Sequence, residues 1–372
     1  MNCLSAFSFF AKKIKEGNEG VFFSVKKPGV IQKDQWIFGW GKKQVADFEK
    51  GPFPFFSITD FLGKENQFWY FENWVSSENI DIDLRLQQEI DLESVYLKKN
   101  KKFEKLFSET EETFSQKILE VQKGQRDGEF WVLNLAQDLK GVFNGKEEEG
   151  NDILLGSFYR FLKSGKGHCG GVVLTSKQKF CSFSPEVFLL QKGLNVSTFP
   201  IKGTGTELEL KDSIKEISEL SMVTDLLRND FGQICEKVWV ERERFLTNEN
   251  DFYHAQSEIR GVLKLVNEKG LSLKAFKKLF PTGSISGAPK KRVTEKIVEL
   301  ENFDRGFYTG IFGVRFSEEE SIFSILIRTL FIQEHFWHFP VGAGITIDSN
   351  PKKEFQETLM KMKVLEEFSF KK

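Results

Sequence analysis

The spacing of hydrophobic residues changes near residue 100. Before that point, short runs rich in Phe and Trp alternate with polar residues, which predicts half-buried strands. The clearest of these runs are 21–25, 35–40 and 67–74. From Phe103 onward, apolar residues recur at helical spacing and predict a helix over 104–123. A basic run at 97–102 separates the two patterns, so we predict a short β-rich part over 1–102 and a larger domain over 103–372.

The larger domain alternates predicted strands with amphipathic helices. The predicted strands are 129–135, 170–175, 180–183, 187–190, 308–315, 321–332 and 336–347. The predicted helices, besides 104–123, are 157–163, 212–230, 272–279, 289–301 and 351–366. Because long strands follow one another directly near the C-terminus, the pattern favours an α+β protein with antiparallel sheet over a doubly wound parallel fold.

Composition and charge exclude several classes of protein. Hydrophobic residues make up 40% of the 372 residues, too many for a disordered chain. Lys and Arg total 53 against 54 Asp and Glu, so there is no overall basic field and we expect no nucleic-acid partner. No apolar run reaches the about 18 residues of a membrane helix, so we expect no membrane association and a cytoplasmic location. The four cysteines stand far apart, which argues against disulfides and zinc.

Two predicted helices each carry a pair of glutamates three residues apart. The pairs are Glu216 with Glu219 and Glu354 with Glu357. This spacing places both carboxylates of a pair on one helix face. If the two faces converge, they offer hard oxygen ligands of the kind that Mg²⁺ binds. Two simpler roles stay open for these glutamates: Ser213 and Glu216 match a capping box, and Glu357 with Lys361 matches a solvated ion pair.

Arg328 stands inside the predicted strand 321–332. With a period of two, its side chain would share a face with Leu326, Leu330 and Ile332. A guanidinium on an apolar face needs an anion, because an uncompensated buried charge is costly. The anion is either a carboxylate or phosphate of a ligand or an internal Asp or Glu.

Glycine-rich segments and one lysine complete the candidate chemistry. The segment 283–290 leads into a predicted helix, and the first N–H groups of a helix are able to bind an anion. The segment Gly342–Gly344 lets another group come close to its backbone. Each segment could also be a plain tight bend. Lys202 lies beside a glycine at a strand end, where it is either exposed or a potential nucleophile. Glu186 offers a carboxyl group for general acid catalysis.

Together these segments resemble the chorismate-utilising enzymes. The matching stretches are SPE (184–186), PIKGT (200–204), ELSMVTDLLRND (219–230), HAQS (254–257), FPTGSISGAPKKR (280–292), RGFYTG (305–310), IRTL (327–330) and GAGITIDSNPKKEFQET (342–358). They occur in the family's order over roughly residues 120 to 370. The resemblance implies a chorismate-binding fold of two orthogonally packed antiparallel sheets flanked by helices.

The resemblance also implies roles for the residues of the site. Glu219 and Glu357 would bind Mg²⁺, with Glu216 and Glu354 in or near its coordination shell. Tyr308 and Arg328 would hold the enolpyruvyl carboxylate of chorismate. The remaining substrate-binding residues implied are Gly203, Thr204, Ser284, Gly342, Ala343, Gly344 and Lys361. The implied catalytic residues are Lys202, Glu186 and His254.

Lys202 distinguishes the branches of the family. Anthranilate synthases usually carry alanine at this position, and isochorismate-type enzymes also lack the lysine. PIKGT is similar to the branch that makes 4-amino-4-deoxychorismate from chorismate and ammonia, the step before p-aminobenzoate in folate synthesis. The resemblance implies a separate glutamine amidotransferase subunit as the source of ammonia. An anthranilate synthase component I, an isochorismate synthase and a non-catalytic chorismate-binding subunit are the alternatives.

Overall fold

The structure is a computed structural model that describes residues 2–26, 33–78, 103–143, 147–207, 210, 213–249, 252–264 and 270–369. It is an α+β protein in which every strand pairing is antiparallel, as predicted. The helices are α1 (Cys3–Lys15), α3 (Glu111–Arg126), α4 (Glu147–Lys163), α6 (Ile214–Gly232), α7 (Leu273–Lys277), α8 (Lys290–Leu300) and α9 (Pro351–Ser369).

The strands fall into two stretches of the chain. Those before α6 are β1 (Gly20–Lys26), β2 (Gln35–Val45), β3 (Phe55–Thr59), β4 (Asn66–Ser76), β5 (Phe103–Phe107), β6 (Val132–Phe143), β7 (His168–Leu174), β8 (Lys179–Ser182), β9 (Val187–Lys192), β10 (Asn195–Thr198) and β11 (Ile201–Gly205). Those after it are β12 (Cys235–Glu249), β13 (Phe252–Leu263), β14 (Gly287–Ala288), β15 (Ile311–Arg315), β16 (Glu320–Ile325), β17 (Thr329–Gln333) and β18 (Phe336–Ile345).

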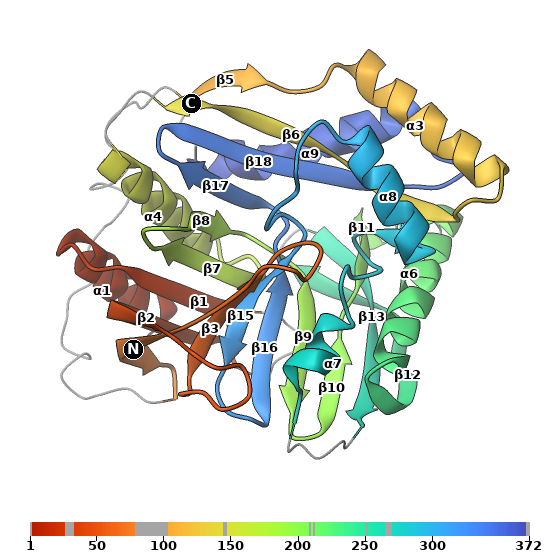
Figure 1. The fold of residues 1–372 in the computed structure, drawn as a ribbon. Coiled ribbons are helices and arrows are strands. Elements are labelled where there is room, and N and C mark those ends of the chain that lie inside the picture. Colours follow the sequence, from red (N-terminus) through yellow and green to blue (C-terminus); the bar gives the residue numbers. More distant parts are fainter. Residues whose placement is uncertain are drawn as a thin grey trace.

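The strands form one continuous antiparallel ladder that turns back on itself. From β5 it runs through β6, β18, β17, β8, β7, β1, β2 and β4 to β3. It continues from β3 through β15, β16, β9 and β10 to β13, which also pairs with β11 and β12. Figure 1 shows β6, β17 and β18 running across the direction of β9, β15 and β16. The two expected sheets are therefore present and are joined through β3.

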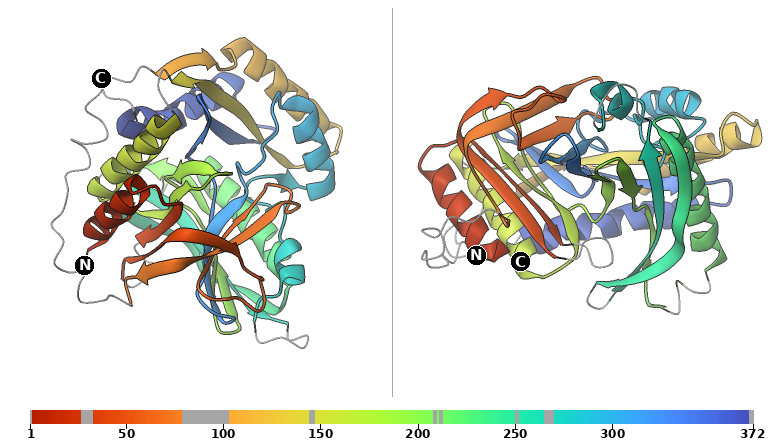
Figure 2. Two further views of the ribbon diagram at one scale, coloured as in Figure 1. Left: turned by 60° about the vertical axis from the view of Figure 1, so that its left-hand side comes forward. Right: turned by 90° about the horizontal axis from the view of Figure 1, so that it is seen from below.

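Helices cover the outer faces of this folded sheet. α1 and α4 pack side by side against β1, β2, β7 and β8, while α9 lies along β18 and α6 along β12 and β13 (Figures 1 and 2). Phenylalanine fills the contact beneath α1 and α4, where the rings of Phe7, Phe22 and Phe158 touch one another. None of the described helices combines the length and the apolar character needed to cross a membrane.

Several predictions for the first half of the chain were wrong or incomplete. Strand β3 was not predicted, and α4 begins at Glu147, well before the predicted helix 157–163. α1 was not predicted, although Phe7, Phe10 and Ile14 recur at helical spacing and are buried. The predicted helix 104–123 begins only at Glu111, where Thr110 caps it, and Phe103–Phe107 is strand β5. The spacing of the apolar residues in 103–107 is compatible with a helix and with a strand. This segment is a strand because it pairs with β6.

Three further predictions were wrong in the second half. The strands β12 and β13 were not predicted, nor were β10 and β11, whose ladder partner is β13. The predicted strand 321–332 is two strands, β16 and β17, separated by residues 326–328. Within the break, Arg328 takes a left-handed backbone conformation with φ of 52°, which is not that of a strand. The argument that Arg328 shares a strand face with Leu326 and Leu330 therefore fails.

The domain boundary stays a prediction, because residues 79–102 lie outside the described part of the chain. The basic run at 97–102 lies there as well. The strands before that stretch do not make a separate sheet, since β1 pairs with β7 and β3 pairs with β15. The N-terminal part is thus built into the same ladder as the rest of the protein.

Candidate active site

A cavity of about 990 Å³ opens where β11 and β18 approach each other, between α6 and α9. Residues from the turn before β15 and from the break between β16 and β17 complete its wall. Most residues predicted from the sequence line it: Glu186, Lys202, Gly203, Glu216, Glu219, Ser284, Tyr308, Arg328, Gly342, Gly344, Glu354, Glu357 and Lys361. Residues far apart in the sequence thus meet at one site.

Three predicted residues are not part of the described cavity wall. Ala343 points into the hydrophobic core, because side chains alternate along β18 and its neighbours Gly342 and Gly344 face the cavity. Thr204 and His254 are opposite each other in the ladder of β11 and β13, just beyond Gly203. His254 is buried there, so a direct role in catalysis stays a prediction.

A bulge in β11 directs Lys202 to its position. The register with β13 shifts between Lys202 and Thr204, and the intervening Gly203 has φ of 79°, a conformation that glycine adopts without strain. The Lys202 Nζ atom lies against Gly344, where a Cβ atom would be only 3.2 Å away. The missing side chain at Gly344 therefore makes room for the amine.

The glutamate pairs reach the cavity from two helices. Ser213 caps α6 by accepting a hydrogen bond from the Glu216 N–H group (3.2 Å), while the Glu216 side chain lines the cavity. If Gly203 had a Cβ atom, that atom would lie only 2.7 Å from Glu216 Oε2. On α9, Lys361 Nζ pairs with Glu357 (2.8 Å) and donates to the Gly342 carbonyl oxygen (2.7 Å). The Ser213 cap and the Lys361–Glu357 ion pair, which were the alternatives to a shared site, are thus both present. The two glutamate pairs nevertheless line the same cavity.

The glutamate carboxylates suit a magnesium ion whose coordination shell is completed by water and substrate. The four paired glutamates line the same cavity, together with Glu186 and Glu111, and Gly203 leaves space for the Glu216 carboxylate. Among the residues that the structure describes, no three His, Cys, Asp or Glu side chains gather closely enough to hold a metal alone. Mg²⁺ commonly uses one or two carboxylates together with water and an anionic substrate. The arrangement suits that mode of binding, in contrast to a closed protein cage.

Tyr308 and Arg328 come from two segments that are hydrogen-bonded to each other. The Thr309 N–H group donates to the Leu326 carbonyl oxygen (2.9 Å), and the Leu326 N–H group donates to that of Gly310 (2.8 Å). Thr309 has φ of 60° and Arg328 φ of 52°, so non-glycine residues hold left-handed conformations in both segments. Strained conformations of this kind often occur at functional sites. Burial raises the pKa of Tyr308, which keeps its hydroxyl group protonated.

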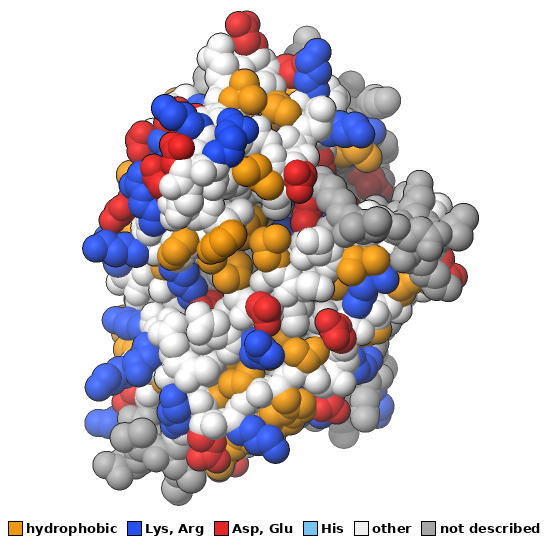
Figure 3. Space-filling view, turned by 90° about the vertical axis from the view of Figure 1, so that its right-hand side faces the viewer, with side chains coloured by type: hydrophobic (Ala, Val, Ile, Leu, Met, Phe, Trp, Pro, Cys, Tyr) orange, Lys and Arg blue, Asp and Glu red, His pale blue; other side chains and the backbone are white. Residues whose placement is uncertain are grey.

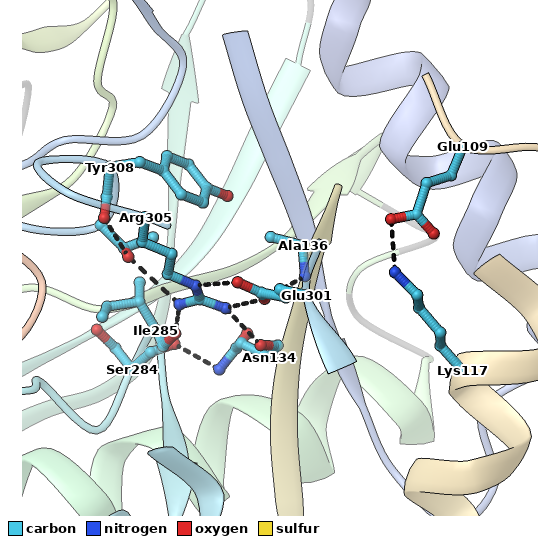
Figure 4. Close-up of polar contacts among 10 residues, drawn as sticks. Glu109, Lys117, Asn134, Ala136, Ser284, Ile285, Glu301, Arg305 and Tyr308 are labelled. Atoms are coloured by element: carbon cyan, nitrogen blue, oxygen red, sulfur yellow. Dashed lines mark hydrogen bonds and ion pairs between the residues drawn. The ribbon is translucent and has the colours of Figure 1, made fainter. Parts of the chain in front are cut away.

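Arg305 was not assigned a role from the sequence, although it begins the RGFYTG stretch. The Arg305 guanidinium binds both carboxylate oxygens of Glu301, at 2.6 and 2.8 Å (Figure 4). It also donates to the Ile285 and Asn134 carbonyl oxygens, at 3.0 and 2.7 Å. Burial would lower the pKa of Arg305, but the Glu301 carboxylate outweighs burial and raises it. The residue is 4% exposed and belongs to the cavity lining itself, so this buried cation joins the neighbouring wall segments to one another.

The loop 283–290 binds an anion, and that anion belongs to the protein. The Gly283 N–H group donates to Asp230 Oδ2 at 3.0 Å, and Lys290 forms an ion pair with the same carboxylate. Burial raises the pKa of Asp230, although Lys290 acts in the opposite direction. The contact fixes the loop to the end of α6, which places Ser284 at the cavity.

Comparisons with known proteins agree with this geometry. The family model for chorismate binding enzymes matches residues 47–367. Anthranilate synthase component 1 1 of Haloarcula marismortui is 34% identical over 270 residues, covering 69% of this chain and 53% of that protein. An uncharacterized PabA-like protein of Haemophilus influenzae is 35% identical over 198 residues, covering 50% of this chain and 59% of that protein. This chain thus spans about half the length of these relatives.

Solved structures share the fold. MenF, the menaquinone-specific isochorismate synthase of Escherichia coli, superposes with a TM-score of 0.75 at 16% identity, covering 99% of this chain and 92% of that one. Anthranilate synthase component I of Streptococcus pneumoniae gives a TM-score of 0.65 at 20% identity, covering 93% and 91%. The predicted fold is confirmed.

Proposed function

Because the chain belongs to the family of chorismate binding enzymes, we propose that it converts chorismate and ammonia into 4-amino-4-deoxychorismate. The observation that carries this choice is the position of Lys202. Its amine lies in the wall of the carboxylate-lined cavity, against the bare backbone of Gly344. An amine held there is placed to attack a bound ring.

The charges around the cavity suit a dianion such as chorismate. Arg328 and the protonated Tyr308 lie in neighbouring segments and provide donors for one carboxylate, which a guanidinium binds with two parallel hydrogen bonds. The four glutamates would repel a second carboxylate unless a cation lies between them. We propose that Glu219 and Glu357 hold Mg²⁺ there, with Glu216 and Glu354 beside it. The ion would neutralise the glutamates and bind the ring carboxylate.

The proposed reaction has two displacement steps at the ring. The neutral Lys202 amine forms a bond to C2, both ring double bonds shift, and the C4–O bond breaks. The leaving hydroxyl group takes a proton from Glu186 and departs as water. Ammonia then forms a bond to C4, both ring double bonds shift back, and the C2–N bond to Lys202 breaks. The lysine is regenerated after proton transfer.

Anthranilate synthesis is the second candidate. Relatives at 34–37% identity carry the name anthranilate synthase component 1, and that enzyme also starts from chorismate. Isochorismate synthesis is the third, because MenF shares the fold. The PabA-like name of other relatives supports a glutamine amidotransferase subunit as the partner that supplies ammonia.

Product analysis tests the proposal. The protein is incubated with chorismate, MgCl₂ and ammonium chloride, and the products are separated by chromatography and identified by mass. We expect 4-amino-4-deoxychorismate as the main product. Anthranilate or isochorismate as the main product would overturn the assignment.

A second measurement addresses Lys202 itself. We expect Lys202→Ala to bind chorismate with little change, because the other charged groups of the cavity remain, and to lose about 100-fold or more in rate because the covalent step is gone. Mass spectrometry of wild-type protein quenched with chorismate but without ammonia should show an adduct on the Lys202 peptide. A variant that makes the product at the normal rate, with no adduct in the wild type, contradicts the mechanism.

A further inference from the structure

The exposed part of the active-site cavity lies along a single helix. Most of the described lining residues are buried or half-buried. Those that are exposed all belong to α9, and we call them the rim: Lys352, Lys353, Gln356, Glu357 and Met360. A molecule that enters the cavity from solvent therefore passes these α9 side chains first.

The rim differs in charge from the deeper part of the cavity. Lys352 and Lys353 supply two positive charges to the rim. The rim carboxylate, Glu357, is already paired with Lys361 at 2.8 Å. The rim thus has an excess of positive charge. Further in, four more glutamates line the cavity: Glu186, Glu216, Glu219 and Glu354.

The rim lysines are not held by carboxylates of the protein. Lys352 Nζ lies 3.8 Å from Glu111 Oε1, and the two side chains are 81% and 41% exposed, so this ion pair contributes little. Lys353 takes part in no ion pair among the side chains that the structure describes. By contrast, Arg292 in the first turn of α8 is paired with Glu129. Both rim lysines are thus available to an anion from solvent.

The position of these lysines is unfavourable for their own helix. Both stand in the first turn of α9, directly after Pro351. The N–H groups at the start of a helix carry partial positive charge, so acidic residues stabilise this turn and each cation costs about 0.3–1 kcal/mol. Residues that break a local rule of this kind are expected at functional sites. Here they are also the residues that border the opening of the cavity.

The molecule as a whole does not attract anions. Its formal net charge is −1. Figure 3 shows Lys and Arg side chains interspersed with Asp and Glu on the side of the molecule where α3, α6 and α8 lie. At physiological ionic strength the Debye length is about 8 Å, so only charges close to the opening act strongly on an entering molecule. The rim lysines are such charges.

We propose that Lys352 and Lys353 capture chorismate at the rim and so raise its concentration at the opening of the cavity. The inference rests on the proposed function in one respect, since it takes the chorismate dianion as the substrate. The deeper glutamates repel a dianion before it reaches Arg328, and two cations at the opening offset that repulsion. The lysines act on binding and take no part in the bond changes at the ring.

The proposed product would be held less firmly by the same lysines. 4-Amino-4-deoxychorismate retains both carboxylates and gains an amine, which is protonated in neutral water. Its net negative charge is therefore smaller than that of chorismate, and its attraction to two cations is weaker. A rim of this charge favours entry of the substrate over retention of the product.

The first test removes both charges. Binding of chorismate is measured by isothermal titration with MgCl₂ in a Lys202→Ala background, so that neither turnover nor ammonium salt interferes. At low ionic strength, Lys352→Gln/Lys353→Gln should raise the Kd by about tenfold, the lower end of what focused charge contributes. In about 1 M NaCl the Debye length is about 3 Å, and the difference should disappear.

A second pair of lysines provides the matched control. Lys274→Gln/Lys277→Gln removes the same charge from two exposed residues of α7 that do not line the cavity. It should leave the Kd unchanged at both salt concentrations. Lys352→Arg/Lys353→Arg keeps the charge and should bind chorismate as tightly as the parent.

Steady-state kinetics in the presence of Lys202 give an independent measurement. With ammonium chloride fixed, Lys352→Gln/Lys353→Gln should raise the KM for chorismate and leave kcat unchanged. A Kd equal to that of the parent at low ionic strength overturns the capture role. So does a loss of affinity that persists in about 1 M NaCl, because a screened charge cannot cause it.

The product separates this inference from the proposed function. If the product is anthranilate or isochorismate and the salt-dependent loss is observed, the capture role stands and the assignment to 4-amino-4-deoxychorismate fails. If the product is 4-amino-4-deoxychorismate and the glutamine variant binds like the parent, the function stands and the capture role fails. Absence of chorismate binding at either salt concentration overturns both.

Discussion

Gly203 has two functions at the scale of single residues. Its left-handed φ of 79° creates the bulge that orients Lys202, and its lack of a side chain leaves room for the Glu216 carboxylate. A Cβ atom there would lie 2.7 Å from Glu216 Oε2 and 2.8 Å from Leu210 Cδ2. One glycine thus positions both the proposed nucleophile and a proposed metal ligand.

Gly203→Ala should therefore reduce stability and activity together. Forcing an alanine into a left-handed conformation costs about 1–2 kcal/mol, and the close contacts add to this. Gly193→Ala is the control, because Gly193 has φ of 61° and open space around it. In urea unfolding, Gly203→Ala should lose more stability than Gly193→Ala, and only Gly203→Ala should lose activity. Equal effects of both variants on activity would contradict this reasoning.

Tyr308 should act as a hydrogen-bond donor over the whole working range of pH. Burial raises the pKa of Tyr308, so the folded state favours the protonated form and the hydroxyl group stays neutral up to and beyond the pKa of about 10 of a free tyrosine. The profile of kcat/KM against pH should show no tyrosine inflection below about pH 10. Tyr308→Phe should raise the KM for chorismate by about tenfold or more, since a hydrogen bond to a charged group contributes about 1.5–3 kcal/mol. An unchanged KM would remove Tyr308 from the substrate site.

The glutamate pairs show how the elements determine the site. Each pair is positioned by ordinary helix geometry, which places residues three apart on one face. Packing on the sheet brings the two helices to the same cavity, because α6 packs on β12 and β13 while α9 packs on β18. On α9, Gln137 of β6 donates to Thr358 Oγ1 at 2.7 Å, which fixes the helix beside its glutamates.

Removing a proposed metal ligand from either helix should have the same effect. Glu219→Gln and Glu357→Gln should each weaken Mg²⁺ binding and lower activity by about 100-fold, the upper end of what changes around metal sites cost. Isothermal titration with MgCl₂ in the presence of chorismate, together with rates in excess EDTA, checks this. Glu295→Gln is the control, because that side chain is exposed on α8 and contacts Arg292. Full activity in EDTA would contradict the magnesium assignment.

The ion pair of Arg305 with Glu301 connects segments from distant parts of the whole molecule. Arg305 joins β6, the 284–286 loop and the turn before β15, while Glu301 also accepts a hydrogen bond from the Ala136 N–H group at 2.8 Å. These segments belong to distant parts of the chain and together form one wall of the cavity. A buried pair with all its partners satisfied holds them in a single arrangement.

Arg305→Met should be strongly destabilising. It leaves the Glu301 carboxylate buried beside no cation, which typically costs about 3–5 kcal/mol. Arg292→Met is the matched control, because it breaks the pair of Arg292 with Glu129, whose side chains are 42% and 35% exposed. Exposed pairs contribute about 0–1 kcal/mol. Urea unfolding measures both variants, and comparable losses would show that burial does not distinguish the two pairs.

The sequence by itself determined the features that depend on local pattern. The helices α6, α8 and α9 were predicted within a few residues of their bounds, because amphipathic spacing and caps are encoded in neighbouring residues. The antiparallel α+β class followed from strands that succeed one another directly. The residue types of the site were identified from short motifs, and most of those residues line one cavity.

Only the tertiary structure decided the features that depend on contacts between residues remote in sequence. Phe103–Phe107 became a strand because β6 lies beside it, and β12 became a strand although its charged residues gave no clear period. The conformation of Arg328, the burial of Ala343 and the bonds of Arg305 depend on neighbours remote in sequence. The active-site cavity exists only where β11, β18, α6 and α9 meet. Local pattern cannot encode these features, because each arises from contacts that form only when distant parts of the chain have come together.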